Sequence, residues 1–428
     1  MKILFLSNNF PPERNAAASR VFERGRIWAE SGHELTVITC APHFPEGKVF
    51  NGYRNTWSED TLDGVRVVRV PVYITANERI LKRILSFTSY MVMAFLAGLF
   101  QRKADVVVAT TPQFFTAIAG WALSRLRREP FILEVSDLWP ASISAVGAIR
   151  RRRLLRLLEA IELFLYRQAS GIVVLSQAFK DDMIRRGIDG RKITVVMNGV
   201  DLARYSPQPR SASLAREVGL HEGKITVGYI GTLGLAHGLE NVLETASLLA
   251  NQAVQFLFVG TGAARTKLES IASATHLRNV VFVPAQPKDR VTEFWSLCDI
   301  ALVHLSDAPL FSTVIPSKIF EAMGMGLPIV LVAPPGEATR IVQSEEVGVC
   351  VPPAQPLALA QSLLALHRDP GQRDALSRCS LAAAPMYTRQ RQADEMLKTL
   401  LWVTKPGTAS PQVGPQYASG QPSEGGQV

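Results

Sequence analysis

Short apolar runs alternate with segments of helical periodicity along nearly the whole chain. Each run is apolar throughout rather than at every second position, which is typical of strands that are covered on both faces. Strands that alternate with helices predict βα units on a parallel sheet, and therefore an α/β fold. In the first half, the predicted strands span 2–7, 34–39, 65–70, 105–110, 131–135, 171–175 and 193–197.

A second series of such units follows a polar break. The stretch 201–223 contains Pro207 and Pro209 and is predicted to be a linker. We expect two tandem Rossmann-like doubly wound domains, at 1–200 and 224–386, facing a cleft, because ligands bind beyond the carboxyl ends of such strands. A C-terminal helix at 387–403 and a disordered tail at 404–428, rich in Pro, Gly, Ser and Gln, complete the prediction. Strands in the second series are predicted at 225–230, 254–259, 279–283, 299–303, 328–331 and 347–351.

Composition agrees with this division and indicates where the protein resides. A chain of 428 residues with 47% hydrophobic residues can fill two cores. The four cysteines are scattered without metal-ligand spacing, and the first apolar run is too short for a signal peptide, so a cytoplasmic location is predicted. Residues 1–205 carry 29 Lys and Arg against 19 Asp and Glu, whereas the remainder carries 17 against 18. The basic half favours an anionic lipid or a phosphorylated ligand, and no nucleic acid is predicted because no nucleic-acid module is recognisable.

The strongest candidate for chemistry is a short helix predicted to begin at Pro316. Proline suits a first helical turn, and Gly324 ends the pattern after about two turns. Ser317 and Lys318 would hold a phosphate there, beside exposed N–H groups and the positive end of the helix dipole. Glu321, one turn further on, would accept hydrogen bonds from the hydroxyl groups of a ribose. Spacing alone leaves an alternative, in which Glu321 lies on a half-exposed helix and pairs with Lys318.

Two glycine-bearing turns follow strands of the second series. Gly231 and Thr232 come after the strand at 225–230, and glycine allows a backbone to approach a pyrophosphate closely. A similar turn follows the strand at 254–259, with Arg265 as a further candidate phosphate ligand. Many such turns bind nothing, and a solvated side chain is the alternative for Arg265.

Taken together, these segments resemble a known family over most of the chain. The chain is similar to the family-4 retaining glycosyltransferases of GT-B fold. Within them it resembles the WbuB-like N-acetylfucosamine transferases, a branch that makes bacterial surface polysaccharides. The matching motifs are Asn9-Phe10-Pro11-Pro12-Glu13, the stretch 32–37, Asp137-Leu138-Trp139-Pro140, Asn198-Gly199-Val200-Asp201, and Pro316-Ser317-Lys318 with Glu321.

The resemblance implies a donor site in the second domain. Glu321 matches the second Glu of the family's Glu-x7-Glu motif, which holds the nucleotide ribose, whereas Thr313 stands where the first Glu, a donor-sugar contact, belongs. Thr232 and His237 likewise stand where the family usually has a diphosphate-binding Arg and Lys. These departures leave the phosphate charge to Lys318, the helix start and Arg265.

In the first domain, the resemblance places Ala16 and Ala17 in a loop that is usually Gly-Gly and approaches the donor phosphate. It places Asp137 near the family's catalytic His or Asp, where a carboxylate could orient the acceptor hydroxyl or accept its proton. The residues alone also allow Asp137 to be a helix cap or a turn residue. The resemblance implies a reaction on one face of the sugar, in which the leaving phosphate oxygen takes the acceptor's proton, so we predict no covalent nucleophile. No metal ion and no other cofactor are predicted, because Asp-x-Asp is absent at the strand ends.

Two apolar segments with basic flanks in the first half bear on membranes. Residues 84–100 carry no charge, lie between Lys82-Arg83 and Arg102-Lys103, and are at the lower limit for a bilayer span. The arginines at 150–153 and 156 precede a leucine-rich helix, a pattern typical of segments that lie at the surface of anionic membranes. A buried core helix and a solvated basic turn are the alternatives. The coincidence of both segments in the basic half predicts a peripheral protein at the inner face of the membrane.

The sequence therefore predicts transfer of a sugar, with retention, from a nucleotide-sugar donor to a polyprenyl-diphosphate-linked acceptor at an anionic membrane surface. The donor is expected to be an N-acetylated UDP-sugar. Two alternatives remain: a UDP-sugar 2-epimerase of the same fold, and a non-catalytic scaffold that binds nucleotide or lipid. An epimerised nucleotide-sugar formed without acceptor would favour the first, and sugar transfer in a membrane extract would exclude the second.

Overall fold

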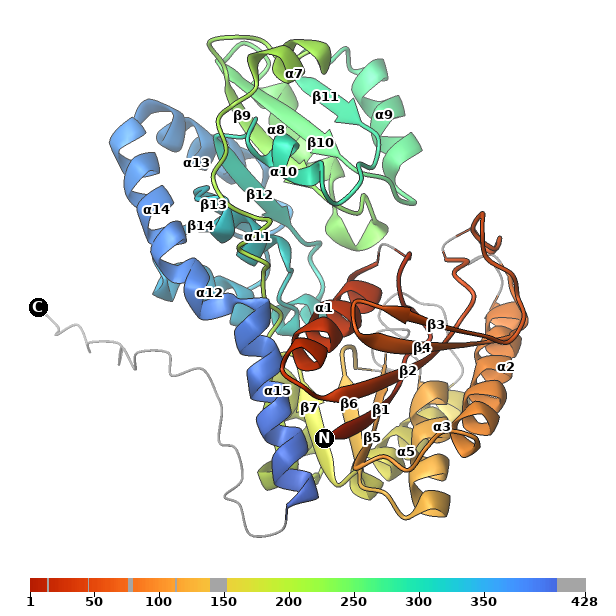
Figure 1. The fold of residues 1–428 in the computed structure, drawn as a ribbon. Coiled ribbons are helices and arrows are strands. Elements are labelled where there is room, and N and C mark those ends of the chain that lie inside the picture. The colour runs from red at the N-terminus through yellow and green to blue at the C-terminus, as the bar shows by residue number, and fades with distance from the viewer. Residues whose placement is uncertain (14, 45, 76–79, 112–113, 139–151, 406–428) are drawn as a thin grey trace, which may run out of the picture. The chain divides into compact units, whose positions relative to one another are not determined.

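The structure is a computed structural model that describes residues 1–13, 15–44, 46–75, 80–111, 114–138 and 152–405 (Figure 1). It divides into two compact units. The N-terminal unit comprises Met1–Asp201 and the end of the chain from Met386, and the C-terminal unit comprises Leu202–Pro385. Each unit is built on its own sheet, so the predicted pair of Rossmann-like α/β domains is confirmed.

The N-terminal sheet has eight strands in the order β3-β4-β2-β1-β5-β6-β7-β8. All neighbouring strands are parallel except β3, which pairs antiparallel with β4 at the edge. The seven predicted strands are confirmed, but β3 was missed because its Ser-Glu-Asp-Thr-Leu sequence carries no apolar run. The strands are β1 (Lys2–Leu6), β2 (Glu34–Cys40), β3 (Ser58–Leu62), β4 (Val65–Val70), β5 (Val106–Thr110), β6 (Phe131–Val135), β7 (Gly171–Val174) and β8 (Ile193–Val195).

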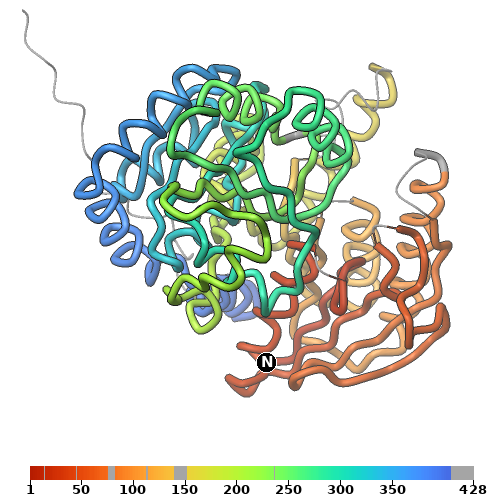
Figure 2. Tube along the Cα trace, turned by 90° about the horizontal axis from the view of Figure 1, so that it is seen from above, coloured from red at the N-terminus to blue at the C-terminus, as the bar shows by residue number. Residues whose placement is uncertain are grey.

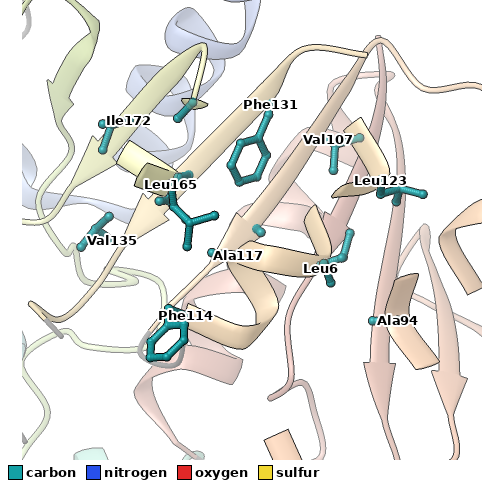
Figure 3. Packing of buried hydrophobic residues seen from close by; sticks show 14 of the residues in the cluster. Leu6, Ala94, Val107, Phe114, Ala117, Leu123, Phe131, Val135, Leu165 and Ile172 are labelled. Atoms are coloured by element: carbon teal, nitrogen blue, oxygen red, sulfur yellow. The ribbon is translucent and has the colours of Figure 1, made fainter. Parts of the chain in front are cut away.

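Helices cover both faces of this sheet. On one face, α2 (Ile80–Leu99), α3 (Phe114–Arg127), α5 (Arg152–Gln168) and α6 (Gln177–Arg185) enclose one apolar cluster. Figure 3 shows part of it, with Phe114, Ala117 and Leu123 of α3 against strand residues such as Val107 and Phe131. On the other face, α1 (Ala16–Glu30) and α15 (Arg389–Thr404) enclose the second cluster. Among the described residues, no helix is long and apolar enough to cross a bilayer.

The C-terminal helix belongs to the N-terminal unit, which the sequence analysis did not foresee. Helix α15 packs against α1 (Figure 1), and the indole Nε1 of Trp28 donates to the carbonyl of Ala393 at 3.0 Å. Arg389 pairs with Glu23 at 2.8 Å. A Cβ on Gly199 would stand 2.6 Å from the backbone of Thr388, so glycine lets the two chain crossings between the units run side by side. The predicted tail from 406 onward lies outside the described residues.

The C-terminal sheet has six parallel strands in the order β11-β10-β9-β12-β13-β14. They match the predicted series, and Figure 2 shows the chain of this unit as the green to blue part of the trace. The predicted linker at 201–223 is wrong, because Leu202 onward is part of this unit and the stretch forms a helix whose Leu214 is buried. The strands are β9 (Ile225–Ile230), β10 (Val254–Val259), β11 (Val280–Val283), β12 (Ile300–His304), β13 (Ile329–Val332) and β14 (Gly348–Val351). The helices are α7 (Ala212–Glu217), α8 (Glu240–Leu248), α9 (Arg265–Ala274), α10 (Val291–Trp295), α11 (Lys318–Gly324), α12 (Glu337–Ser344), α13 (Pro356–Arg368) and α14 (Pro370–Ala383).

Candidate functional site

The strand order of the C-terminal sheet reverses between β9 and β12. In open α/β sheets, ligands bind at the carboxyl ends of the strands where the order reverses, because the loops there diverge. Three polar side chains gather at this point. Tyr229 comes from β9, His304 ends β12, and Lys318 begins α11. The topology therefore selects this edge as the candidate site of the unit.

Lys318 reaches from α11 back to the end of β9. Its Nζ lies 4.7 Å from the centroid of the Tyr229 ring and 3.3 Å from the Tyr229 hydroxyl oxygen. That hydroxyl donates to the carbonyl oxygen of Thr232 at 2.9 Å. A Cβ on Gly231 would stand 2.6 Å from Cε of Lys318, so a larger residue would displace this lysine, and the φ of +138° at Gly231 also favours glycine. The fold thus brings together Gly231, Thr232 and Lys318, three of the residues that the sequence analysis singled out.

The environment of Lys318 makes it a cation that an anionic ligand would stabilise. Burial lowers the pKa of Lys318 to about 8, and the negative charge of Glu321 opposes this shift. The ammonium therefore remains mostly protonated at neutral pH, although it has lost much of its water. An anion bound beside it would replace the lost solvation. The site can thus hold a phosphate group by a side-chain cation.

The helix that carries Lys318 begins two residues later than predicted. Ser317 is its N-cap residue and makes no capping hydrogen bond through its side chain. The carbonyl of Pro316 accepts from the N–H of Ile319 at 3.2 Å, which makes Pro316-Ser317 a turn rather than the first helical residues. The charge at the site is therefore the side chain of Lys318 folded over β9. The roles of Ser317 and of the half-buried Glu321 stay predictions.

The glycine-bearing turns after β9 and β10 are interlocked. A Cβ on Gly260 would stand 1.9 Å from the carbonyl oxygen of Gly231, and the N–H of Leu233 donates to the carbonyl oxygen of Thr261 at 2.9 Å. Arg265 begins α9 directly after the turn that follows β10. Its Nη1 donates to the carbonyl oxygens of Gly260 at 2.5 Å and Val283 at 3.1 Å, and its Nε pairs with Glu269 at 2.8 Å. The guanidinium thus links the end of β10 to the end of β11, and its role as a phosphate ligand stays a prediction.

Thr313 ends a short 3-10 helix, η3 (Pro309–Thr313). Its hydroxyl donates to the carbonyl oxygen of Leu310 at 2.8 Å, within the same turn. The neighbouring Ser312 carbonyl is so close to Gly336 that a Cβ there would approach it to 2.0 Å. Local packing accounts for this segment, and the contact of Thr313 with a donor sugar stays a prediction.

Two histidines form a reciprocal pair at the same edge. Nδ1 of His237, in the short 3-10 helix η2 (Leu235–His237), lies 3.3 Å from the carbonyl oxygen of His304. Nδ1 of His304 lies 2.6 Å from the carbonyl oxygen of His237, and its Nε2 lies 3.0 Å from Nδ2 of Asn241. Gly238 has φ +57°, and a Cβ there would stand 3.2 Å from Ser306, so glycine allows the turn to close against β12. The pair fixes the turn after β9 to the end of β12.

In the N-terminal unit, Asp137 follows β6 at the carboxyl edge of the sheet. The preceding residue, Ser136, is held by two hydrogen bonds to Thr111. Its backbone N–H donates to Oγ1 of Thr111 at 2.9 Å, and its Oγ donates to the carbonyl of Thr111 at 2.7 Å. Asp137 is half-buried. Its catalytic role stays a prediction, and Trp139-Pro140 of the same motif lie outside the described residues.

A buried ion network lies three residues before Asp137. Glu134 in β6 is fully buried and accepts from Nη1 and Nη2 of Arg24 at 2.9 and 3.0 Å, and from Nε of Arg20 at 3.1 Å. Burial alone would raise the pKa of Glu134, but the charges of Arg24 and Arg20 outweigh it and lower the pKa to about 2. Both arginines project from α1, so the network fixes this helix to β6.

Ala16 and Ala17 are the first two residues of α1 rather than part of a loop. Asn15 caps the helix, with its Oδ1 accepting from the N–H of Ala18 at 2.8 Å. The two alanines therefore form the start of α1, and this helix is fixed to β6 by the ion pairs of Arg20 and Arg24 with Glu134. Their contact with a donor phosphate stays a prediction.

Sequence reasoning missed Tyr229, His304, Asn241 and Glu134. Tyr229 and Glu134 lie inside predicted strands, where they looked like strand residues of no special role. A polar residue near the carboxyl end of an apolar strand, such as Glu134 or His304, is the feature that could have identified them.

Comparison with known proteins bears on both units. Residues 15–199 match the glycosyl transferase 4-like domain, and residues 212–380 match the glycosyl transferases group 1 domain. WcaI of Escherichia coli (strain K12), named for colanic acid biosynthesis, is 27% identical over 376 residues, which cover 85% of this chain and 91% of WcaI. A GDP-mannose-dependent alpha-mannosyltransferase of Mycobacterium tuberculosis is 26% identical over 355 residues, which cover 82% of this chain and 84% of that protein.

Solved structures share the fold across nearly the whole chain. Sucrose-phosphate synthase from Thermosynechococcus elongatus superposes with a TM-score of 0.73 at 17% identity, covering 93% of this chain and 97% of that one. Anabaena HepE in complex with UDP gives a TM-score of 0.69 at 18% identity, covering 94% and 99%. At such identities the likeness concerns the fold.

Two Rossmann-like units with these strand orders have the architecture of the GT-B glycosyltransferases. With a glycosyl transferase 4-like domain followed by a group 1 domain, this chain is a glycosyltransferase of that fold.

Proposed function

We propose that this protein transfers a sugar, with retention and without a metal ion, from an N-acetylated UDP-sugar to a polyprenyl-diphosphate-linked saccharide. The product would enter a bacterial surface polysaccharide. One observation carries the proposal: the Lys318 ammonium sits against Tyr229 and Gly231 at the switch point of the C-terminal sheet. A diphosphate at this edge would neutralise Lys318, and its ribose would lie one turn along α11, at Glu321.

Names of related proteins support a role in polysaccharide synthesis, whereas the donors that they name differ, since the relative from Mycobacterium tuberculosis is GDP-mannose-dependent. WcaI is named for colanic acid biosynthesis, and WbjE of Pseudomonas aeruginosa, 26% identical over 61% of this chain, is named as a glycosyltransferase. HepE was solved with UDP and with UDP-glucose. The WbuB-like subtype and the N-acetylated sugar rest on the sequence resemblance.

The proposed chemistry exchanges one bond to the sugar's anomeric carbon for another. The bond to the UDP oxygen breaks as the acceptor hydroxyl forms a new bond on the same face. The acceptor's proton passes to the leaving phosphate oxygen, so no covalent enzyme intermediate is needed. Lys318 would stabilise the charge that develops on the diphosphate. Asp137 would orient the acceptor hydroxyl from the N-terminal unit.

A lipid-linked acceptor requires a surface that meets the membrane, and we assign this surface to the helical layer α2–α3–α5. These helices pack side by side, with Trp121 of α3 edge-on to Phe164 of α5 at 5.0 Å. The layer's basic residues would meet anionic headgroups. Of the predicted arginine run, 150 and 151 lie outside the described residues. Exposed apolar side chains of the layer are Ile84, Leu85, Val92, Leu96, Leu99, Phe100, Leu126, Leu154, Leu157 and Phe164, and basic ones are Lys82, Arg102, Lys103, Arg125, Arg152, Arg153, Arg156 and Arg167.

The double change Leu96→Asp and Leu157→Asp is expected to weaken binding to vesicles of phosphatidylglycerol and phosphatidylcholine at least tenfold. Each substitution removes about 1.5–3 kcal/mol of apolar burial and adds a charge that anionic lipid repels. Sedimentation with vesicles measures the effect, and binding should also fall as salt is raised. Leu357→Asp, at an exposed leucine of the C-terminal unit, is the matched control. Equal binding of the double variant and the control would assign membrane contact to another surface.

Incubation with radiolabelled nucleotide-sugars and bacterial membranes tests the proposed reaction. Label from one UDP-sugar is expected in the lipid fraction, bound through an α or β linkage identical to that of the donor. A panel of UDP-N-acetylglucosamine, UDP-glucose and GDP-mannose distinguishes the nucleotide. Formation of an epimerised nucleotide-sugar in the absence of membranes, with no label in lipid, would contradict the assignment.

A further inference from the structure

The reciprocal histidine pair determines which ring nitrogens carry protons. A carbonyl oxygen only accepts hydrogen bonds, so Nδ1 of His237 and Nδ1 of His304 must both be donors. Burial lowers the pKa of both histidines to about 4, and the charge of Lys318 adds to the effect on His237. Each ring is therefore neutral at pH 7, with its proton on Nδ1 and a lone pair on Nε2.

The two acceptor nitrogens differ in their surroundings. Nε2 of His304 accepts from the side-chain amide of Asn241. Nε2 of His237 has no hydrogen-bond partner among the residues that the structure describes. It is also not among the polar side-chain atoms that are fully buried without a partner, so it is accessible to a ligand. This edge of the His237 ring faces the glycine-bearing turn, where a Cβ on Gly234 would stand 3.7 Å from Nε2. The ring also meets Tyr229 edge-on at 6.0 Å, on the side of the site that holds Lys318.

We propose that Nε2 of His237 accepts a hydrogen bond from a hydroxyl or acetamido N–H group of the sugar carried by the nucleotide donor, which makes His237 a specificity-determining residue. This inference rests on the proposed function and deepens it. A neutral imidazole whose open nitrogen is an acceptor cannot neutralise a phosphate, and an ionised diphosphate has no proton to donate to it. The groups that fit are O–H and N–H donors. The ribose hydroxyls are assigned to Glu321, and the uracil N–H lies beyond the ribose from the diphosphate. The hydroxyls and the acetamido N–H of the sugar remain as the match for His237.

Calorimetric titration with UDP and with three UDP-hexoses tests this assignment. The hexoses are UDP-N-acetylglucosamine, UDP-glucose and UDP-galactose, and the one that wild type binds best becomes the probe. His237→Phe is expected to weaken binding of the probe about tenfold and to leave UDP within about twofold, because it removes one hydrogen bond made only to the sugar. His237→Gln retains an oxygen acceptor and should recover part of the loss. His221→Phe, at an exposed histidine of the same unit, is the control and should change neither affinity.

Each outcome decides the inference. Equal losses for UDP and the probe would place His237 against the nucleotide and overturn the assignment, as would unchanged affinities in both His237 variants. The assignment would also be overturned if wild type bound UDP but bound none of the three UDP-hexoses more tightly than UDP. Wild type that binds neither UDP nor a UDP-hexose would instead overturn the proposed function. If His237→Phe fails to fold, which its melting temperature reveals, His237→Gln gives the answer, with a smaller loss expected for the probe alone.

Discussion

Glu134→Gln is expected to lower the free energy of unfolding by about 3–5 kcal/mol, the usual effect of breaking a buried ion pair. The amide keeps the shape of the carboxylate but removes the charge that balances Arg20 and Arg24, whose guanidinium groups are almost completely buried. Two cations would then remain in the interior without an anion. Urea unfolding followed by circular dichroism measures the loss.

The matched control for this prediction is Glu159→Gln. Glu159 pairs with Arg186 at 3.5 Å, but its side chain is half exposed, so a change below about 1 kcal/mol is expected. Acid unfolding gives a second readout. The folded pKa of Glu134, about 2, lies below its ordinary value of 4.5, so its contribution is present above pH 4.5 and is lost as the pH falls towards 2. Wild type should therefore lose more stability than Glu134→Gln across this window, and parallel acid transitions would contradict the ionised assignment.

Lys318→Ala is expected to weaken UDP binding by about 1.5–3 kcal/mol, or ~10- to 150-fold, the range for hydrogen bonds to charged groups. The ammonium is the cation that the fold places at the switch point, and alanine would leave the diphosphate charge without it. Glu321→Ala should also weaken UDP binding, through the ribose. Isothermal calorimetry measures both. Unchanged UDP affinity in both variants would show that the nucleotide does not bind at this edge of the sheet.

Lys224→Ala is the control, because Lys224 precedes β9 at the opposite end of the strand. The pH dependence adds a test of mechanism. Since burial lowers the pKa of Lys318 to about 8, the ammonium loses its proton as the pH rises from 7 to 9, and UDP affinity should fall several-fold over that range. In Lys318→Arg the cation remains charged, so this decline should disappear. A decline that persists in the arginine variant would come from another group.

The candidate site was predictable only in part. The Pro-Ser-Lys sequence pointed to Lys318, and the glycine after β9 pointed to Gly231, because each belongs to a local motif with a known physical use. Their contact joins residues 87 positions apart in the chain (318 − 231), and the lysine lies over Tyr229, 89 positions away. Arg265 makes contacts that its local motif did not indicate. Its position beside a glycine-bearing turn suggested a phosphate ligand, which stays a prediction, and the structure adds hydrogen bonds from its guanidinium to the carbonyls of Gly260 and Val283.

The sequence by itself determined the architecture. Uninterrupted apolar runs are stable only when both faces of a strand are covered, so two series of them, spaced by helices, required two parallel sheets with helices on either side. Edge strand β3 escaped because pairing at an edge needs backbone groups more than apolar side chains. Only the tertiary structure decided which distant residues meet. It returned α15 to the first unit, where Ala393 meets Trp28, and it enclosed Glu134 between two arginines of α1. Periodicity specifies which face of an element is buried, whereas the partner on that face depends on how the chain closes in space.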